Sequence, residues 1–86
     1  MLKVSVISPE RTLFEGEASS VVAPAYDGEV GILQGHAPMM TLLGRGSLRL
    51  GDKRFEIEGG FLQVVDNVVR IVTEKATAGL PERKNH

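Results

Sequence analysis

The sequence predicts an all-β protein built as a β-sandwich, in which two sheets pack face to face. Short segments of alternating apolar and polar residues, about eight to ten in number, recur along the chain with turn residues between them. No amphipathic helical pattern occurs before residue 75. One sheet of so many strands would leave a face of Val, Leu and Ile in water, so two sheets are expected to cover each other.

The strands are expected in order along the chain. Leu2, Val4 and Val6 alternate with polar residues, and Pro9 ends this first segment. Gly16 lies inside the second extended segment, and we expect a β-bulge or a bend there. The remaining strands are expected over residues 12–15, 19–23, 29–32, 38–43, 47–50, 53–58, 61–65 and 68–72.

Turn chemistry separates these segments. Gly51-Asp52 is a two-residue hairpin signal, and Asp66-Asn67 predicts a second tight turn because both residues tolerate a left-handed backbone. Gly59-Gly60 marks a further break. Phe55 and Ile57 alternate with charged residues, so both side chains are expected in the core.

Composition excludes several classes of function. The chain has 86 residues, enough for one small domain, and no cysteine, so it has neither disulfides nor thiolate metal sites. The net charge is −1 without a basic run, which disfavours nucleic-acid binding. No apolar run approaches the ~20 residues that a membrane helix needs. We therefore expect a soluble intracellular protein with no direct membrane insertion.

The usual catalytic and cofactor motifs are missing. Gly44-Arg45-Gly46 is not followed by the third glycine of a dinucleotide fingerprint, because Arg49 stands there. There is no P-loop and no GxSxG elbow, and two histidines do not make a metal site. Glu29 and His36 are the one conceivable acid–base pair, but their segment carries no nucleophile. We expect a non-enzyme without catalytic residue, cofactor or metal.

One stretch is distinctive. Residues 28–38 read GEVGILQGHAP, which resembles the signature loop of the epsilon subunit of F-type ATP synthase, roughly G-E-x-G-I-x-x-G-H-A-P. Residues 59–64, GGFLQV, are similar to the family's G-G-x-x-x-V segment, and Ser8-Pro9-Glu10 looks like its first turn. The resemblance runs from about Leu2 to Ala76, nearly the whole chain, as expected for one small domain.

The resemblance implies a sandwich of two five-stranded sheets and a rotor role in the central stalk. In that family the domain binds the gamma subunit and the polar loops of the c-ring, coupling proton-driven rotation to ATP synthesis at the cytoplasmic face of the membrane. Gln34 replaces a proline that is common in the family, which loosens the turn slightly. The residues implied to form the c-ring-contact loop are Glu29, Gly31, Ile32, Gly35 and His36.

Two assignments stay open. Residues 39–43 are apolar in both parities, which favours a strand covered on both faces. The alternative is that Met40 and Leu42 face gamma, since methionine suits adaptable apolar contacts. Tyr26 is either a loop anchor or an interface residue.

The end of the chain departs from the family. We expect the sandwich over residues 1–76 and a polar tail over 77–86, with a short helical turn after Pro81. The family's inhibitory helical hairpin is missing, and the sequence does not decide between a naturally short and a shortened chain. A competing hypothesis is a free-standing sandwich that binds a small ligand such as a sugar, which an exposed aromatic pair on one strand face would favour.

Overall fold

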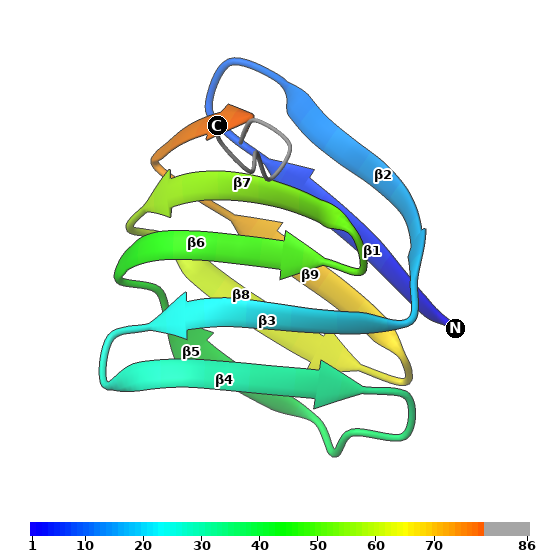
Figure 1. The fold of residues 1–86 in the computed structure, drawn as a ribbon. Coiled ribbons are helices and arrows are strands. Elements are labelled where there is room, and N and C mark those ends of the chain that lie inside the picture. The colour runs from blue at the N-terminus through cyan, green and yellow to red at the C-terminus, as the bar shows by residue number, and fades with distance from the viewer. Residues whose placement is uncertain (79–86) are drawn as a thin grey trace, which may run out of the picture.

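The computed structural model describes residues 1–78, which form strands and turns and no helix (Figure 1). The all-β prediction is therefore confirmed for this part of the chain. Ten strands follow one another: β1 (Leu2–Ile7), β2 (Thr12–Ala18), β3 (Ser20–Ala25), β4 (Gly28–Leu33), β5 (Met39–Leu42), β6 (Arg45–Leu50), β7 (Lys53–Glu58), β8 (Phe61–Val65), β9 (Val68–Val72) and β10 (Lys75–Ala78).

The strands form two five-stranded sheets, as the family resemblance implied. In the first, called sheet A, the order is β2-β1-β9-β8-β5, and in sheet B it is β10-β7-β6-β3-β4. Figure 1 shows the two sheets as stacked layers. The pairing of β1 with β9 is parallel, and the other pairings of these strands are antiparallel. The outer strands of each sheet are therefore β2 and β5 in one layer, and β10 and β4 in the other.

The core lies between the sheets and follows the alternation of the sequence. Phe55 and Ile57 are buried as expected. The rings of Phe14 on sheet A and Phe55 on sheet B meet edge to face with centroids 6.4 Å apart, a favourable aromatic geometry. The buried apolar side chains are Leu2, Val4, Val6, Ala18, Val21, Ala23, Ile32, Leu43, Leu48, Leu50, Phe55, Ile57, Leu62, Val64, Val69 and Ile71.

Both predicted hairpin turns have the backbone that their residues favour. Gly51, between β6 and β7, has a φ of 62°. Asp66 and Asn67, between β8 and β9, have φ values of 50° and 65°. A left-handed pair of this kind matches the twist of the flanking strands, so these residues fix the register of β8 against β9.

Gly60 marks the point where the chain passes from β7 in sheet B to β8 in sheet A. Its φ is 107°, and a Cβ atom added there would lie 1.9 Å from the carbonyl oxygen of Val72. Since real Cβ contacts never come so close, only glycine fits at this crossing.

The bulge expected at Gly16 is wrong, because Gly16 pairs regularly with Val4. The register shifts instead between Val6 and Ile7, which pair with Phe14 and Thr12, so Leu13 is the extra residue. Gly16 has a different role. A Cβ atom there would lie 3.2 Å from the ring of Phe14, so glycine leaves room for that ring.

The last strand, β10, pairs with β7 and carries sheet B past residue 76, where the sandwich was expected to end. Lys75 lies opposite Glu58, and Ala78 lies opposite Phe55. The helical turn expected after Pro81 and most of the expected polar tail fall outside the described residues.

Candidate interaction site

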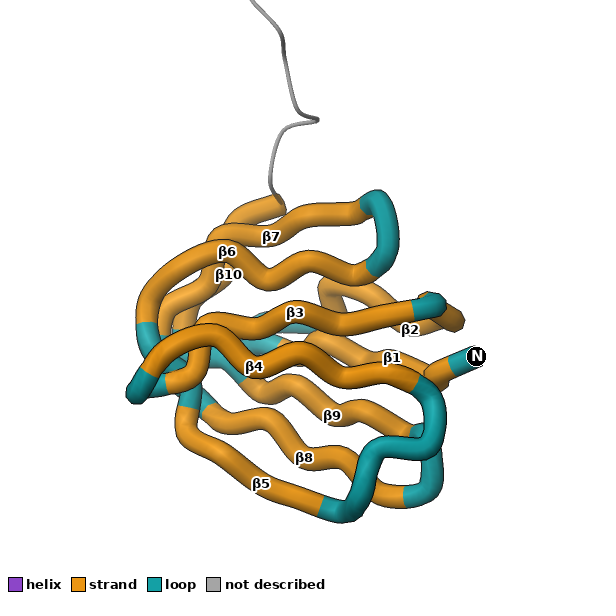
Figure 2. Tube along the Cα trace, turned by 60° about the horizontal axis from the view of Figure 1, so that its bottom comes forward, coloured by secondary structure: helices purple, strands orange, loops and turns teal. Residues whose placement is uncertain are grey.

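The loop from β4 to β5 connects the two sheets at one end of the sandwich (Figure 2). Its turn is closed by the His36 N–H, which donates to the Leu33 carbonyl at 3.1 Å, and Gly35 has a φ of 89°. The Gly35 N–H donates to Oδ1 of Asn67 at 2.7 Å, and the amino group of Met1 donates to Oε1 of Gln34 at 2.6 Å. The loop therefore has a fixed shape although Gln34 replaces the family's proline.

His36 is half-buried in this loop. Its Nδ1 lies 2.7 Å from the carbonyl oxygen of Ala37. Because a carbonyl oxygen only accepts, Nδ1 carries the proton of this hydrogen bond. The neutral ring is then left with Nε2 as a hydrogen-bond acceptor for another group.

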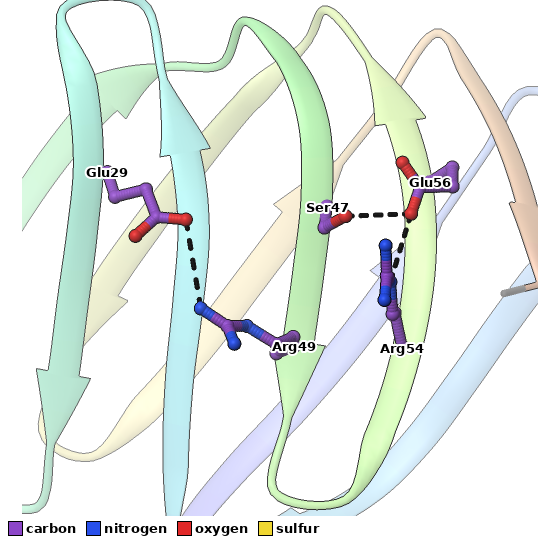
Figure 3. Close-up of polar contacts among 5 residues, drawn as sticks. All are labelled: Glu29, Ser47, Arg49, Arg54 and Glu56. Carbon is purple, nitrogen blue, oxygen red and sulfur yellow. Dashed lines mark hydrogen bonds and ion pairs between the residues drawn. The ribbon is translucent and has the colours of Figure 1, made fainter. Parts of the chain in front are cut away.

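Glu29 lies at the opposite end of β4 from this loop, next to the β3–β4 turn. At about 3.3 Å per residue, the backbone positions of Glu29 and Leu33 are separated by roughly 13 Å along the strand. Glu29 instead faces Arg49 of β6, with 3.8 Å between a carboxylate oxygen and Nη2 (Figure 3). The structure does not bring Glu29 and His36 together, so they do not form an acid–base pair, and the expected contact residues do not form one compact loop.

The other two expected contact residues on β4 differ in exposure. Gly31 is exposed, and nothing lies within 4 Å of a Cβ atom built on it. Ile32 is 1% exposed and belongs to the core. The expectation that Ile32 contributes to the contact is therefore wrong for its side chain, which anchors β4 from the inside.

The strand β5 has one covered face and one open face, so the favoured expectation of a strand covered on both faces is wrong. Met40 and Leu42 are each 62% exposed, whereas Met39 packs against the core. The cause is the two-layer architecture, because sheet B covers only the inner face of sheet A and, among residues 1–78, no third layer covers the outer face. The open alternative, in which Met40 and Leu42 face outward, is the arrangement in the structure.

The exposed side chains of β5 continue onto β8 and β9. Leu42 of β5 lies opposite Phe61 of β8, and at the other end of β8 Val65 lies opposite Val68 of β9. Val65 and Val68 are 43% and 44% exposed. Phe61, Gln63 and Val65 alternate with Leu62 and Val64 in the sequence, which indicates that the two sets face opposite sides of the sheet. The sequence alone did not show which of the two sets faces outward. We call Met40, Leu42, Phe61, Val65 and Val68 the apolar face.

The outer face of sheet B has the opposite chemistry (Figure 3). The Ser47 hydroxyl donates to Oε2 of Glu56 at 2.7 Å, and Nε of Arg54 donates to the same oxygen at 3.1 Å. The hydrogen bond from Ser47, followed by that from Arg54, lowers the pKa of the Glu56 carboxyl below its ordinary value. We call Glu29, Ser47, Arg49, Arg54 and Glu56 the charged face.

Tyr26 and the phenylalanines bear on the competing sugar-binding hypothesis. Tyr26 is 69% exposed at the β3–β4 turn, so it is not a buried loop anchor, and its backbone N–H donates to the Leu42 carbonyl at 3.0 Å. Phe14 and Phe55 pair within the core. Among residues 1–78, therefore, no two aromatic side chains form a pair on one solvent-facing strand face.

Within residues 1–78 no three His, Cys, Asp or Glu side chains come close enough to hold a metal ion together. This part of the chain also contains no helix that is long and apolar enough to cross a membrane. The distinctive features of the described residues are two exposed surfaces. One is the apolar face, and the other is the edge of β4 with the shaped loop that follows it.

The fold and the site together define a class of protein, a two-layer β-sandwich domain with an exposed apolar face and a shaped loop at its edge. The family whose description reads ATP synthase, delta/epsilon chain, β-sandwich domain, matches residues 1–79. The chain belongs to this family, as the resemblance of residues 28–38 predicted.

Individual relatives agree with this assignment. The chain is 49% identical over 77 residues to the ATP synthase epsilon chain of Leptospira borgpetersenii, a match that spans 85% of this chain and 61% of that relative. The epsilon chain of Caulobacter vibrioides is 42% identical over 79 residues, which span 87% of this chain and 92% of the relative. The chain therefore spans less than the full length of some relatives and nearly the full length of others.

The fold also matches a solved assembly. A chain in the cryo-EM structure of the Euglena gracilis mitochondrial ATP synthase, containing OSCP, F1 and the c-ring, superposes with a TM-score of 0.83 at 25% identity. The match covers 90% of this chain and 52% of that chain.

Proposed function

We propose that this chain is a non-catalytic rotor subunit of the ATP synthase central stalk, which couples proton-driven rotation of the c-ring to the gamma subunit and thereby to ATP synthesis. It is a peripheral component on the cytoplasmic face of the membrane. The observation that carries the proposal is the apolar face of sheet A, which lies beside the family's signature loop and is left uncovered by residues 1–78.

The apolar face is the surface that docks on gamma. Met40 and Leu42 project from an edge strand, and exposed apolar patches of this kind mark sites of protein association. Their burial against a partner removes apolar area from water and drives the association. The charged face is a poorer docking surface, since its carboxylates already have partners within the chain.

The c-ring contact runs along the edge of β4 rather than at one loop. Glu29 is exposed at one end of this edge, Gly31 leaves it open in the middle, and Gly35 and His36 form the loop at the other end. Carboxylate contacts of this exposed kind set the orientation of a partner more than the affinity. The two-sheet sandwich supplies the stiffness that transmission of torque requires.

Binding to isolated gamma tests the proposal through a pair of matched variants. Leu42→Glu puts a charge into the apolar face, and Leu33→Glu puts the same charge at a leucine of similar exposure, 64%, on β4 of the other sheet. Leu42→Glu is expected to weaken binding about 30-fold, as for a central interface residue, while Leu33→Glu binds like the unmodified chain. Absence of binding by the unmodified chain, or equal losses in both variants, would refute the assignment of gamma to this face.

A further inference from the structure

Asn67 joins three segments that are far apart in the sequence. Its backbone lies in the β8–β9 turn, and its carbonyl oxygen accepts the N–H of Lys3 at 2.9 Å, which begins the pairing of β1 with β9. Its side-chain Oδ1 accepts the N–H of Gly35 at 2.7 Å, across 32 positions of sequence. One residue therefore connects the turn, the first strand and the β4–β5 loop.

Two hydrogen bonds attach the loop to other segments, one from the Met1 amino group to the Gln34 side chain and this one from the Gly35 backbone to Asn67. Within residues 1–78, the loop backbone from Gln34 to Ala37 has one hydrogen bond to another segment, the bond from Gly35 to Asn67. The remaining bonds of that backbone are local, from His36 to Leu33 and between the His36 ring and Ala37. The local bonds shape the turn, whereas the bond to Asn67 fixes where the turn lies against sheet A.

The turn itself does not require an asparagine side chain. At a φ of 65° glycine would fit as well as asparagine, and glycine is the commoner residue at the second position of such turns. Asparagine adds a neutral oxygen that can accept a hydrogen bond while it tolerates the left-handed backbone. The presence of an asparagine side chain at this position is therefore explained by its hydrogen bond from the Gly35 amide rather than by the turn.

We propose that Asn67 is a positioning residue for the partner-facing loop: by accepting the Gly35 amide, it sets the direction in which His36 presents Nε2. Its effect on partner binding rests on the function proposed above for this loop, but its effect on loop geometry does not. Asn67 acts through Gly35 and His36 and needs no contact of its own with the partner.

Three variants separate the side chain from the turn. Asn67→Gly keeps the left-handed backbone and the bond from Lys3, and removes the acceptor. Asn67→Asp keeps an acceptor oxygen. Asp66→Gly is the matched control, since it changes the neighbouring left-handed residue, whose φ is 50°, and leaves Asn67 in place.

The first measurement is amide hydrogen exchange of Gly35 in the full chain. Asn67→Gly is expected to speed this exchange about five-fold, the effect of losing one hydrogen bond of ordinary net strength, with little change in the midpoint of unfolding. Asp66→Gly should leave the Gly35 amide unchanged, and Asn67→Asp should restore its protection. Unchanged exchange in Asn67→Gly would overturn the proposal, as would an equal acceleration in Asp66→Gly.

The second measurement is binding to purified c-ring in detergent. Asn67→Gly is expected to bind about five-fold more weakly than the unmodified chain, with rescue by Asn67→Asp. Equal binding by Asn67→Gly and the unmodified chain would overturn the positioning role. If the unmodified chain itself does not bind, the function proposed for the loop fails, while the exchange of Gly35 still decides whether Asn67 holds it.

Discussion

On sheet B the outward side chains of β6 and β7 are charged or hydroxyl groups with polar partners, whereas on sheet A the outward side chains of β5 and of both ends of β8 are apolar. Glu56 receives hydrogen bonds from Ser47 and Arg54, and Glu29 faces Arg49. Met40 and Leu42 are instead each 62% exposed in the part of the chain that the structure describes. Both faces are the outer surfaces of five-stranded sheets, so the difference lies in which residues occupy the outward parity.

The contrast shows what each face requires from outside the chain. Exposed ion pairs contribute little stability but make a surface that is satisfied in water. An apolar patch on an edge strand gains from being covered, and an uncovered edge also invites non-specific association. The proposed function therefore assigns the apolar face as the docking side for gamma, and the charged face on β6 and β7 as a solvent side.

The largest expected effect comes from breaking the link between the two sheets. Gly60→Ala would put a Cβ atom 1.9 Å from the Val72 carbonyl oxygen at a φ of 107°. We expect a loss of about 4 kcal/mol or more in the free energy of unfolding, from the clash and the backbone strain together. Chemical denaturation measures it, and both faces should be lost in a single transition.

Gly51→Ala is the control for that variant. Gly51 also has a positive φ, 62°, but nothing lies within 4 Å of a Cβ atom built on it. Only the backbone term should remain, about 1 kcal/mol. Equal losses of unfolding free energy in the two variants would mean that the close approach of Gly60 to Val72 does not cause the destabilisation of Gly60→Ala.

The next prediction compares the two methionines of β5, which are adjacent in sequence but point to opposite sides. Met39→Ser should lower the free energy of unfolding by about 1–2 kcal/mol, because Met39 packs against the core. Met40→Ser should change it by less than about 0.5 kcal/mol, because Met40 is 62% exposed. Thermal and chemical denaturation of both variants give these values.

For gamma binding the order should reverse, with the larger loss in Met40→Ser. If Met39→Ser weakens gamma binding more than Met40→Ser at a temperature where both are folded, the apolar face is not the docking side.

The sequence was sufficient for those parts of the fold that depend on local pattern. Alternation placed Phe55 and Ile57 in the core, and the left-handed preference of Asp66 and Asn67 gave the β8–β9 hairpin. These signals lie within a few residues of each other, so no knowledge of the tertiary fold was needed.

The sequence was insufficient where the answer depended on distant neighbours. Residues 39–43 are apolar in both parities, so only the register of β5 against β8, in which Met39 lies opposite the buried Val64, shows which parity is uncovered. Glu29 and His36 are close in sequence, but an extended strand holds them apart. Asn67 reaches Gly35 across 32 positions, and no local pattern predicts such a bond.

A smaller effect should appear on the charged face as the pH is changed. The folded pKa of Glu56 is lowered below the ordinary 4.5, chiefly by the hydrogen bond from Ser47 and then by Arg54. The ionised carboxylate therefore stabilises the fold at pH values above the ordinary pKa, and this contribution disappears as the pH falls through the lowered pKa. Ser47→Ala should lower the midpoint of unfolding near pH 7 and have no effect at about pH 2.

An NMR titration of the Glu56 carboxyl provides the direct check, since Ser47→Ala should move its pKa back toward 4.5. A Ser47→Ala deficit that persists unchanged at low pH would show that Ser47 acts by packing rather than through the ionised carboxylate.

The smallest effect on stability is expected at Glu29. This residue nevertheless tests whether the whole charged face stays in solvent or whether its β4 edge contacts a partner. The Glu29 and Arg49 side chains are 63% and 54% exposed and 3.8 Å apart, so Glu29→Lys should cost no more than about 0.5 kcal/mol. Docking to the c-ring should nevertheless weaken, because the variant reverses the charge at the edge of β4. Glu17→Lys, the same charge change at an exposed residue of β2, should dock normally.

The two measurements on Glu29→Lys separate a contact from a structural role. If the variant unfolds, Glu29 is part of what holds sheet B together, and its loss of docking carries no information about the c-ring. If it folds and docks like the unmodified chain, Glu29 is not a c-ring contact, β4 presents only its loop to the c-ring, and the whole charged face is a solvent side. Weaker docking with an intact fold would instead divide sheet B into a solvated centre on β6 and β7 and a contact edge on β4.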